Sequence, residues 1–267
     1  MNTEAGRKFA VITGGSSGIG YEFAKVCAEE GFEVLIVADY GTDEAAEQLR
    51  AGGAAVTPLQ ADLSTFEGNE GVAATIQQRS QPVDILALNA AVGVGGAFLE
   101  TDLERDLALI QLNIGSVVHL SKRLLPAMVT RGQGRVMITS SIAATMPGPY
   151  YATYAASKAY LLSFAEAIRY ELKDTGVSVT ALLPGPTDTE FFDRARMQDT
   201  PVAEARKDDP GEVARDAFQA LMAGDDKVVA GSVKNLLQAA AARLAPEQFK
   251  AARHAAQTKP KDQEERA

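Results

Sequence analysis

The sequence is poor in the residues that form disulfides and metal centres. Its 267 residues include one cysteine, Cys27, and two histidines, His119 and His254, which lie far apart in the sequence. A single cysteine excludes an intrachain disulfide and is typical of proteins in a reducing compartment. No metal-ligand cluster is recognisable, so we expect no metal centre, although a site built of carboxylates alone stays open.

Long hydrophobic runs and blocks of basic residues are also missing. Apolar runs such as Phe9–Thr13 and Val34–Val37 are far shorter than the ~20 residues of a membrane span. The amino-terminal residues lack the apolar segment of a secretory signal. The net charge is −9, without a dense group of Lys and Arg. We therefore expect a cytoplasmic protein that binds neither nucleic acid nor a membrane.

What the sequence does contain is a regular alternation of strand and helix patterns. Helices are predicted over 43–50, 67–78, 103–129 and 154–173. Strands are predicted at Phe9–Thr13, Val34–Val37, Val56–Gln60, Val83–Leu88, Val136–Thr139, Val177–Leu183 and Val228–Ala230. No linker interrupts this alternation, which predicts a single doubly wound α/β domain over residues 1–267, with a core at about 7–231.

Two segments lie outside the alternation. Residues 188–210 are polar but carry Phe191, Phe192 and Met197. Because they follow the carboxyl end of a strand, we favour a lid that closes on a substrate over a surface excursion. The carboxyl-terminal part, 232–267, is predicted to hold Ala-rich helix at 236–256 and a charged, disordered tail from Thr258.

A glycine-rich turn joins the first predicted strand to the helix after it. Its spacing is G-x-x-x-G-x-G, from Gly14 to Gly20. Small residues let a backbone approach a pyrophosphate, and the following helix N-terminus supplies N–H groups and a positive dipole. A tight turn without a ligand is the alternative, and the position between strand and helix favours phosphate binding.

An acid follows the second predicted strand. Asp39 lies 19 residues after Gly20, where a dinucleotide fold often places a carboxylate for the adenosine ribose hydroxyls. A carboxylate there repels a 2′-phosphate. A solvated loop aspartate is the alternative.

A possible proton-transfer group lies near the middle of the chain. Tyr154 and Lys158 are four residues apart and share a face of a predicted helix. Ser140 and Ser141 end the strand upstream, and Asn113 occupies an unfavourable place inside a predicted helix. A phenol, an ammonium and a hydroxyl together are the parts of an acid–base site.

The combined motifs resemble the short-chain dehydrogenase/reductase family, in its single-domain Rossmann branch. The resemblance covers about residues 9–230 and rests on six motifs in the family's order: Thr13–Gly20 (TGGSSGIG), Asn89-Ala90-Ala91, Asn113, Ser141, Tyr154-x-x-x-Lys158 and Pro184-Gly185. It implies a seven-stranded, mostly parallel sheet of order 3-2-1-4-5-6-7 with helices on both faces.

The resemblance also implies residue roles. The catalytic residues would be Asn113, Ser141, Tyr154 and Lys158; the family's spacing of thirteen residues before the tyrosine selects Ser141 over Ser140. The cofactor-binding residues would be Gly14, Ser16, Ser17, Gly18, Ile19, Gly20, Asp39, Asp62, Leu63, Asn89, Ala90, Ala91, Tyr154, Lys158, Pro184, Gly185, Thr187 and Thr189.

Two positions depart from the family pattern, and two others bear on the choice of cofactor. Ala91 stands where the family commonly has Gly, and Thr187 where it often has Ile or Val. NADP-using members often carry a base at the place of Ser17 or Asp39, and neither residue here is basic. The resemblance therefore favours NAD over NADP.

The activity implied is NAD(P)-dependent interconversion of a secondary alcohol and a ketone, with Tyr154 as acid and base. One alternative is a catalytically silent NAD(P)-binding regulatory or scaffold protein of the same fold; another is a lyase or epimerase. Few charges occur in the predicted pocket segments, which favours a small, neutral or partly apolar substrate. Family members often associate through their long helices, so a homodimer or homotetramer is expected.

Overall fold

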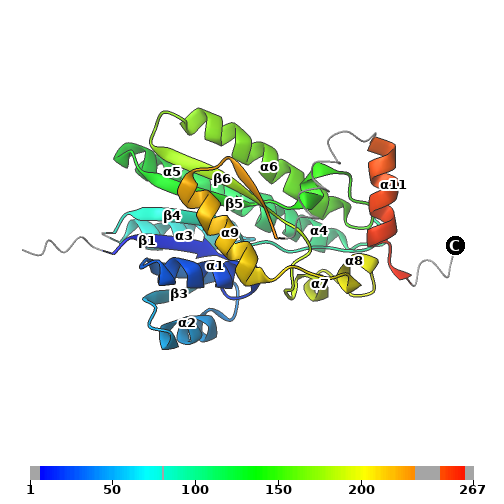
Figure 1. Ribbon diagram of the computed structural model, residues 1–267, viewed down its shortest axis with the longest axis horizontal. Coiled ribbons are helices and arrows are strands. Elements are labelled where there is room, and N and C mark those ends of the chain that lie inside the picture. The colour runs from blue at the N-terminus through cyan, green and yellow to red at the C-terminus, as the bar shows by residue number, and fades with distance from the viewer. Residues whose placement is uncertain (1–6, 80, 232–246, 262–267) are drawn as a thin grey trace, which may run out of the picture.

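A parallel sheet forms the centre of the molecule (Figure 1). The computed structural model describes residues 7–79, 81–231 and 247–261. In these residues seven strands follow the order β3-β2-β1-β4-β5-β6-β7, which confirms the predicted order, and all neighbours are parallel. The strands are β1 (Phe9–Thr13), β2 (Glu33–Ala38), β3 (Val56–Gln60), β4 (Val83–Leu88), β5 (Gly134–Thr139), β6 (Val177–Pro184) and β7 (Lys227–Ala230).

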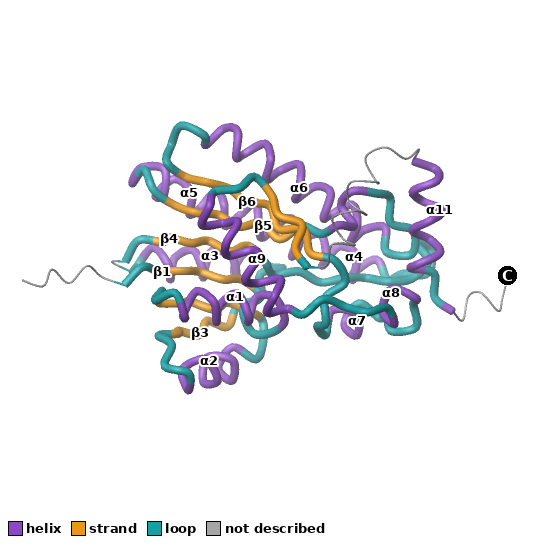
Figure 2. The backbone as a smooth tube through the Cα atoms, in the orientation of Figure 1, coloured by secondary structure: helices purple, strands orange, loops and turns teal. Residues whose placement is uncertain are grey.

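Helices cover both faces of the sheet (Figure 2). Those that flank it are α1 (Gly18–Glu29), α2 (Thr42–Ala51), α3 (Phe66–Gln77), α5 (Ser116–Arg131), α6 (Ala152–Leu172) and α9 (Pro210–Ala223). Helices α3, α5 and α6 share one apolar core with the sheet, and α1, α2 and α9 share the other. In β1, Phe9 and Val11 face the first core while Ala10 and Ile12 face the second, because successive side chains point to opposite faces. A strand buried on both faces has to be apolar throughout, as β1 is.

The helix predicted over 103–129 is interrupted. Helix α4 (Leu103–Ile110) passes into a π-helical turn, Gln111–Gly115, before α5 begins. The prediction of one regular helix is therefore wrong around Asn113. The side chain of Asn113 is fully buried and bonds both main-chain groups of Val92, at 2.9 and 3.0 Å. These contacts with a distant segment accompany the wider turn, and π-turns of this kind are often found at functional sites.

The segment 188–210 carries two short helices, α7 (Phe191–Arg194) and α8 (Pro201–Glu204). Phe192 and Met197 are buried in a small apolar cluster with Tyr151 and Ala155. The main-chain N–H of Gly95 donates a 2.9 Å bond to the carbonyl of Ala195 in the same segment. This packing holds the segment against the rest of the molecule, and its role as a lid stays a prediction.

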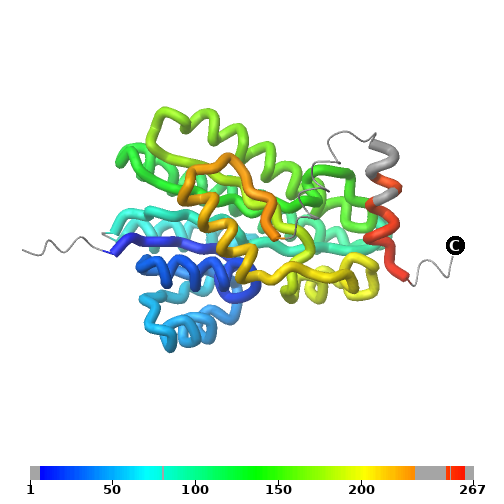
Figure 3. The backbone as a smooth tube through the Cα atoms, in the orientation of Figure 1, coloured from blue at the N-terminus to red at the C-terminus, as the bar shows by residue number. Residues whose placement is uncertain are grey.

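The carboxyl-terminal helix α11 (Glu247–Thr258) lies at the same end of the molecule as α7 and α8 (Figure 3). The predicted helix 236–256 falls partly outside the described residues, as does the tail beyond 261. The disorder predicted from Thr258 is wrong for its first residues. Thr258 is buried and ends α11, and the Lys261 side chain pairs with Glu204.

Among the helices described, none has the length and apolar character needed to cross a membrane. Nor do the described side chains include three or more His, Cys, Asp or Glu grouped as metal ligands.

Candidate active site

A cavity of about 490 Å³ lies at the carboxyl ends of the central strands. The structure brings nearly all the predicted site residues to its wall; the exceptions are Gly20 and Asn113, which lie behind it. The predicted residues that line it are Gly14, Ser16, Ser17, Gly18, Ile19, Asp39, Asp62, Leu63, Asn89, Ala90, Ala91, Ser141, Tyr154, Lys158, Pro184, Gly185, Thr187 and Thr189. Parallel strands end at one edge of the sheet, which is why motifs far apart in sequence meet here.

The glycine turn forms one side of the cavity. A side chain on Gly20 would collide with the carbonyl of Gly14 and the amide of Asn89, so only glycine fits. Ser17 precedes α1 but makes no side-chain capping bond, and the first turn of α1 carries no acidic residue. The N–H groups and the positive end of the helix dipole are therefore available to bind an anion. This geometry fits the pyrophosphate of a dinucleotide.

Asn89 ties together the ends of three strands. Its main-chain N–H donates to the Thr13 hydroxyl at 2.9 Å, and its side-chain amide donates to the Thr13 carbonyl at 3.2 Å. Its side-chain oxygen accepts a 3.1 Å bond from Thr139. Asn89 thus joins β1, β4 and β5 at the cavity wall.

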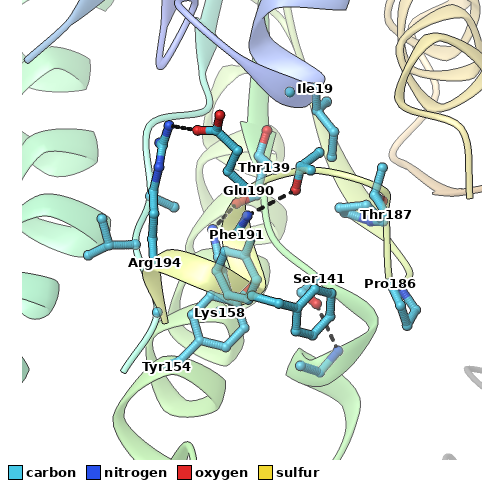
Figure 4. A pocket seen from close by; sticks show the side chains of 18 of the residues that line it. Ile19, Thr139, Ser141, Tyr154, Lys158, Pro186, Thr187, Glu190, Phe191 and Arg194 are labelled. Carbon is cyan, nitrogen blue, oxygen red and sulfur yellow. Dashed lines mark hydrogen bonds and ion pairs between the residues drawn. The ribbon is translucent and has the colours of Figure 1, made fainter. Parts of the chain in front are cut away.

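Ser17 and Gly18 of the turn meet the segment 188–210. The methyl carbon of Thr189 lies close enough to Gly18 that a side chain there would approach it to 2.9 Å. From α7, Arg194 hydrogen-bonds the Ser17 hydroxyl at 3.4 Å, stacks over the Tyr40 ring at 4.8 Å and pairs with Glu190 (Figure 4). The sequence analysis missed Arg194, because no local pattern connects it with Ser17, 177 residues away.

The acid–base group lies deeper in the cavity, where Tyr154, Lys158 and Ser141 lie near one another (Figure 4). The Lys158 ammonium lies 5.7 Å from the centre of the Tyr154 ring and donates a 2.8 Å bond to the Thr139 carbonyl. The Ser141 hydroxyl oxygen accepts a 3.1 Å bond from Ala143 N–H, which leaves its hydrogen to donate to the Tyr154 phenol. Ser140 instead donates to the Lys158 carbonyl at 2.7 Å. Only Ser141 of the two serines faces the phenol.

Burial perturbs two of these groups. Desolvation raises the pKa of Tyr154 to about 12, and the hydrogen bond from Ser141 acts in the opposite direction. Desolvation lowers the pKa of Lys158 to about 7, because burial penalises the ammonium. A phenol and an amine with shifted pKa values in one cavity are typical of an acid–base site.

Asn113 lies behind this group. Its amide hydrogens are used by the Val92 carbonyl and, at 3.1 Å, by the Ser157 hydroxyl. One lone pair of its side-chain oxygen remains for a water molecule.

Comparison with known proteins places the chain in a family. Residues 8–200 match the family model described as short chain dehydrogenase. A short chain dehydrogenase of Pseudocercospora fijiensis is 32% identical over 188 residues, which is 69% of this chain and 61% of that protein. Oxidoreductase UcpA of Salmonella typhimurium is 31% identical over 217 residues, 80% of each chain.

The chain belongs to the short chain dehydrogenase family. The family, predicted from the motifs, is therefore confirmed, and with it the class of NAD(P)-dependent oxidoreductases. Solved structures agree: a short-chain dehydrogenase from Sphingobium yanoikuyae in complex with NADPH has a TM-score of 0.77, with 28% identity over 83% of this chain and 87% of that one. An actinorhodin polyketide ketoreductase with NADPH has a TM-score of 0.74, with 28% identity over 86% of this chain and 97% of that one.

Two further residues line the cavity but are not among the predicted site residues. Tyr151 lines the cavity and stacks on Tyr154, with ring centres 5.8 Å apart. His254 lines the same cavity from α11. A single histidine in an Ala-rich helix gives no signal of such a place.

Proposed function

We propose that this member of the short chain dehydrogenase family interconverts a secondary alcohol and a ketone with a nicotinamide dinucleotide. The observation that carries the proposal is that the Tyr154 phenol, hydrogen-bonded by Ser141, shares one cavity with the glycine turn. The dinucleotide, when bound, accepts or supplies the hydride. The silent scaffold alternative has less support, because each of the proposed acid–base residues is present.

The cavity offers a distinct place for each part of the dinucleotide. We propose that the turn from Gly14 to Gly20 and the start of α1 hold the pyrophosphate, through Ser16, Ser17 and Ile19. Asp39, Asp62 and Leu63 would hold the adenosine, and Asn89 to Ala91 the ribose region. Pro184, Gly185, Thr187 and Thr189, after β6, would lie beside the nicotinamide together with Lys158.

The proton chemistry falls to the chain's own side chains. In alcohol oxidation Tyr154 takes the hydroxyl proton at its phenolic oxygen, and in ketone reduction it returns it. Before substrate binds, the single hydroxyl hydrogen of Ser141 is donated to the phenol; when substrate is bound it turns to the substrate oxygen and stabilises the charge that develops there. A protonated Lys158 favours the phenolate, and Asn113 would hold a water that connects Lys158 with solvent.

Replacing Tyr154 with Phe tests the function. The variant loses the transferable proton but keeps the ring and the cofactor cavity. We expect kcat to fall by at least ~100-fold while NADH and NADPH still bind. Turnover is followed at the nicotinamide absorbance with a panel of alcohols and ketones, and binding by calorimetry. Full activity of Tyr154→Phe, or an inactive wild-type protein across the panel, contradicts the proposal.

For the cofactor, we propose a preference for NAD. Asp39 lines the cavity near the adenosine end, and its charge disfavours a 2′-phosphate. Arg194 is the one nearby cation among the described residues that contacts Ser17, and its charge is offset by Glu190.

Replacing Asp39 with Arg tests this preference. We expect the ratio of kcat/KM for NADP over NAD to rise roughly tenfold or more, since a charge-assisted hydrogen bond contributes about 1.5–3 kcal/mol. Asp43→Arg is the control, because it adds the same charge on an exposed residue that does not line the cavity. The wild-type protein could instead prefer NADP and lose this preference in Arg194→Ala. That result would contradict the proposal and would show that Arg194, in the proposed lid, selects the cofactor.

The substrate we propose is small, neutral and partly apolar. The cavity near Tyr154 is lined by Met146, Tyr151, Phe191, Phe192 and Met197. Such a wall favours the alkyl or aryl groups of a ketone over charged groups. We further propose that the chain acts as one domain, with 188–210 as its lid, and that it assembles as a homo-oligomer.

A further inference from the structure

Helix α11 brings a histidine into the active-site cavity from outside the segment that the family model matches. The match ends at residue 200, whereas α11 begins at Glu247. His254 and Thr258 nevertheless line the cavity that holds Tyr154. Helix α11 contacts the lid helix α8 and lies at the same end of the molecule (Figure 1).

The His254 ring is held by both of its nitrogens. Nδ1 lies 2.8 Å from the Pro147 carbonyl, which can only accept, so Nδ1 carries the hydrogen. In the neutral ring Nε2 is then the acceptor, and the Tyr151 hydroxyl donates to it. Burial lowers the pKa of His254, which favours this neutral form. Thr258, one turn further along α11, donates a 2.8 Å bond to the Pro149 carbonyl.

Tyr151 connects this histidine to the phenol of Tyr154. The Tyr151 and Tyr154 rings are nearly parallel, with an angle of 22° and centres 5.8 Å apart. The Tyr151 ring meets the His254 ring edge-on at 5.1 Å. On its other side, Tyr154 meets Phe191 of the lid at 5.0 Å. Imidazole, phenol and phenol thus form a continuous series of ring contacts from α11 to the proposed acid–base residue.

A buried histidine can also act as a simple packing residue. Two features separate His254 from that role. Its hydrogen-bond partners, Pro147 and Tyr151, both belong to the stretch that leads into Tyr154. The hydrogen bond that His254 accepts comes from the hydroxyl of Tyr151. The Tyr151 side chain is buried and lines the cavity beside Tyr154, where we propose that the substrate binds.

We propose that His254 is a positioning residue: by accepting the Tyr151 hydroxyl it fixes the aromatic wall against which the apolar group of the substrate packs beside Tyr154. This inference rests on the proposed function. Without His254 the Tyr151 hydroxyl loses its partner in a buried place, which costs free energy and favours rotation of the ring out of the stack. The substrate is then held less well, while the dinucleotide, bound at the glycine turn, is unaffected.

The test is a double-mutant cycle on His254 and Tyr151. We expect His254→Leu to raise KM for the ketone roughly tenfold, with a smaller change in kcat and an unchanged Kd for the dinucleotide. Tyr151→Phe should have a similar effect, and the double variant should be no worse than the worse single one, because the two residues act as one unit. His254→Gln, which keeps an acceptor, should recover most of the loss.

The control is Ala256→Ser, an exposed position of the same helix, which should leave every parameter unchanged. With an active wild-type protein, unchanged KM values in His254→Leu, or effects that multiply in the double variant, overturn the inference alone. If His254→Leu does not fold, His254→Gln and Tyr151→Phe decide by the same comparison. A wild-type protein inactive with all alcohols and ketones overturns the proposed function and this inference together.

Discussion

At the scale of single residues, three tyrosines within five positions have three different environments. Tyr154 faces Ser141 and has a pKa raised to about 12 by desolvation. Burial raises the pKa of Tyr151 further still, and the charge of an ionised Tyr154 acts in the same direction. Tyr150 adopts a left-handed backbone, with φ of 62°, and its carbonyl accepts a bond from Gly96. Only Tyr154 combines a lysine nearby with a hydroxyl donor.

The pH dependence of alcohol oxidation should report the Ser141 hydrogen bond. Oxidation needs the Tyr154 phenolate, so the rate rises with pH as the phenol loses its proton. The bond from Ser141 lowers the pKa of Tyr154, so Ser141→Ala should raise that pKa and move the rising limb to higher pH. At a fixed neutral pH we expect kcat/KM to fall about 100-fold, because a donor to the developing charge is also lost.

Ser140→Ala is the matched comparison for this measurement. Its hydroxyl bonds the Lys158 carbonyl and not the phenol, so the position of the rising limb should stay the same. A pH–rate profile that moves equally in both variants would refute the assignment of Ser141.

At the scale of elements, the proposed lid packs against a glycine-rich segment, residues 91–98. A side chain on Gly95 would collide with Met197, and one on Gly93 would approach Phe191 to 2.7 Å. The absence of side chains at Gly93 and Gly95 leaves room for Phe191 and Met197, both of which line the cavity. The small residues of 91–98 therefore serve the lid as well as the cavity.

Gly95→Ala should displace the lid and weaken substrate binding. Overpacking of this kind costs about 1–3 kcal/mol, which corresponds to a rise in KM of roughly fivefold to 150-fold where the cost falls on substrate binding. Steady-state kinetics and thermal unfolding measure the two effects. Gly71→Ala in α3 is the control, because no atom lies within 4 Å of the added carbon. An unchanged KM in Gly95→Ala would mean that the lid does not close on the substrate.

At the scale of the whole molecule, α4 carries an exposed apolar stripe. Leu103, Leu107 and Ile110 recur at helical spacing, with 70%, 51% and 37% of their surface exposed. Leu99 lies just before them and is 95% exposed. Such a group of large apolar side chains is typical of a protein–protein contact. It supports the proposed homo-oligomer, in which this stripe faces a second copy of the chain.

Leu107→Glu should disrupt that assembly. A buried, unpaired carboxylate at the centre of the stripe disfavours association, so the molar mass measured by light scattering should fall to that of a monomer. Glu47→Lys, which changes the charge of an exposed residue on α2, should keep the wild-type mass. A wild-type protein that is itself monomeric, or an unchanged mass in Leu107→Glu, contradicts the proposal.

The sequence by itself determined the family, the sheet order and the part of the cavity wall that the strand-end motifs and the Tyr154–Lys158 turn supply. The reason is local: strand-end motifs such as Gly14–Gly20 and Asn89–Ala91 are read over a few residues, and a parallel sheet brings strand ends to one edge. Lys158 is four residues from Tyr154, so one helical turn places the two together. The regular alternation of buried strands and amphipathic helices predicts the layers without further information.

Only the tertiary structure decided the contacts between distant segments. Asn113 meets Val92 through a π-turn, Arg194 reaches Ser17 from the lid, and His254 bonds Tyr151 across 103 residues. No periodicity links these pairs, because each depends on where an entire element packs. Short motifs therefore suffice to predict the family and its chemistry. The shape of the cavity beside Tyr154 depends instead on how the segment 188–210 and α11 pack.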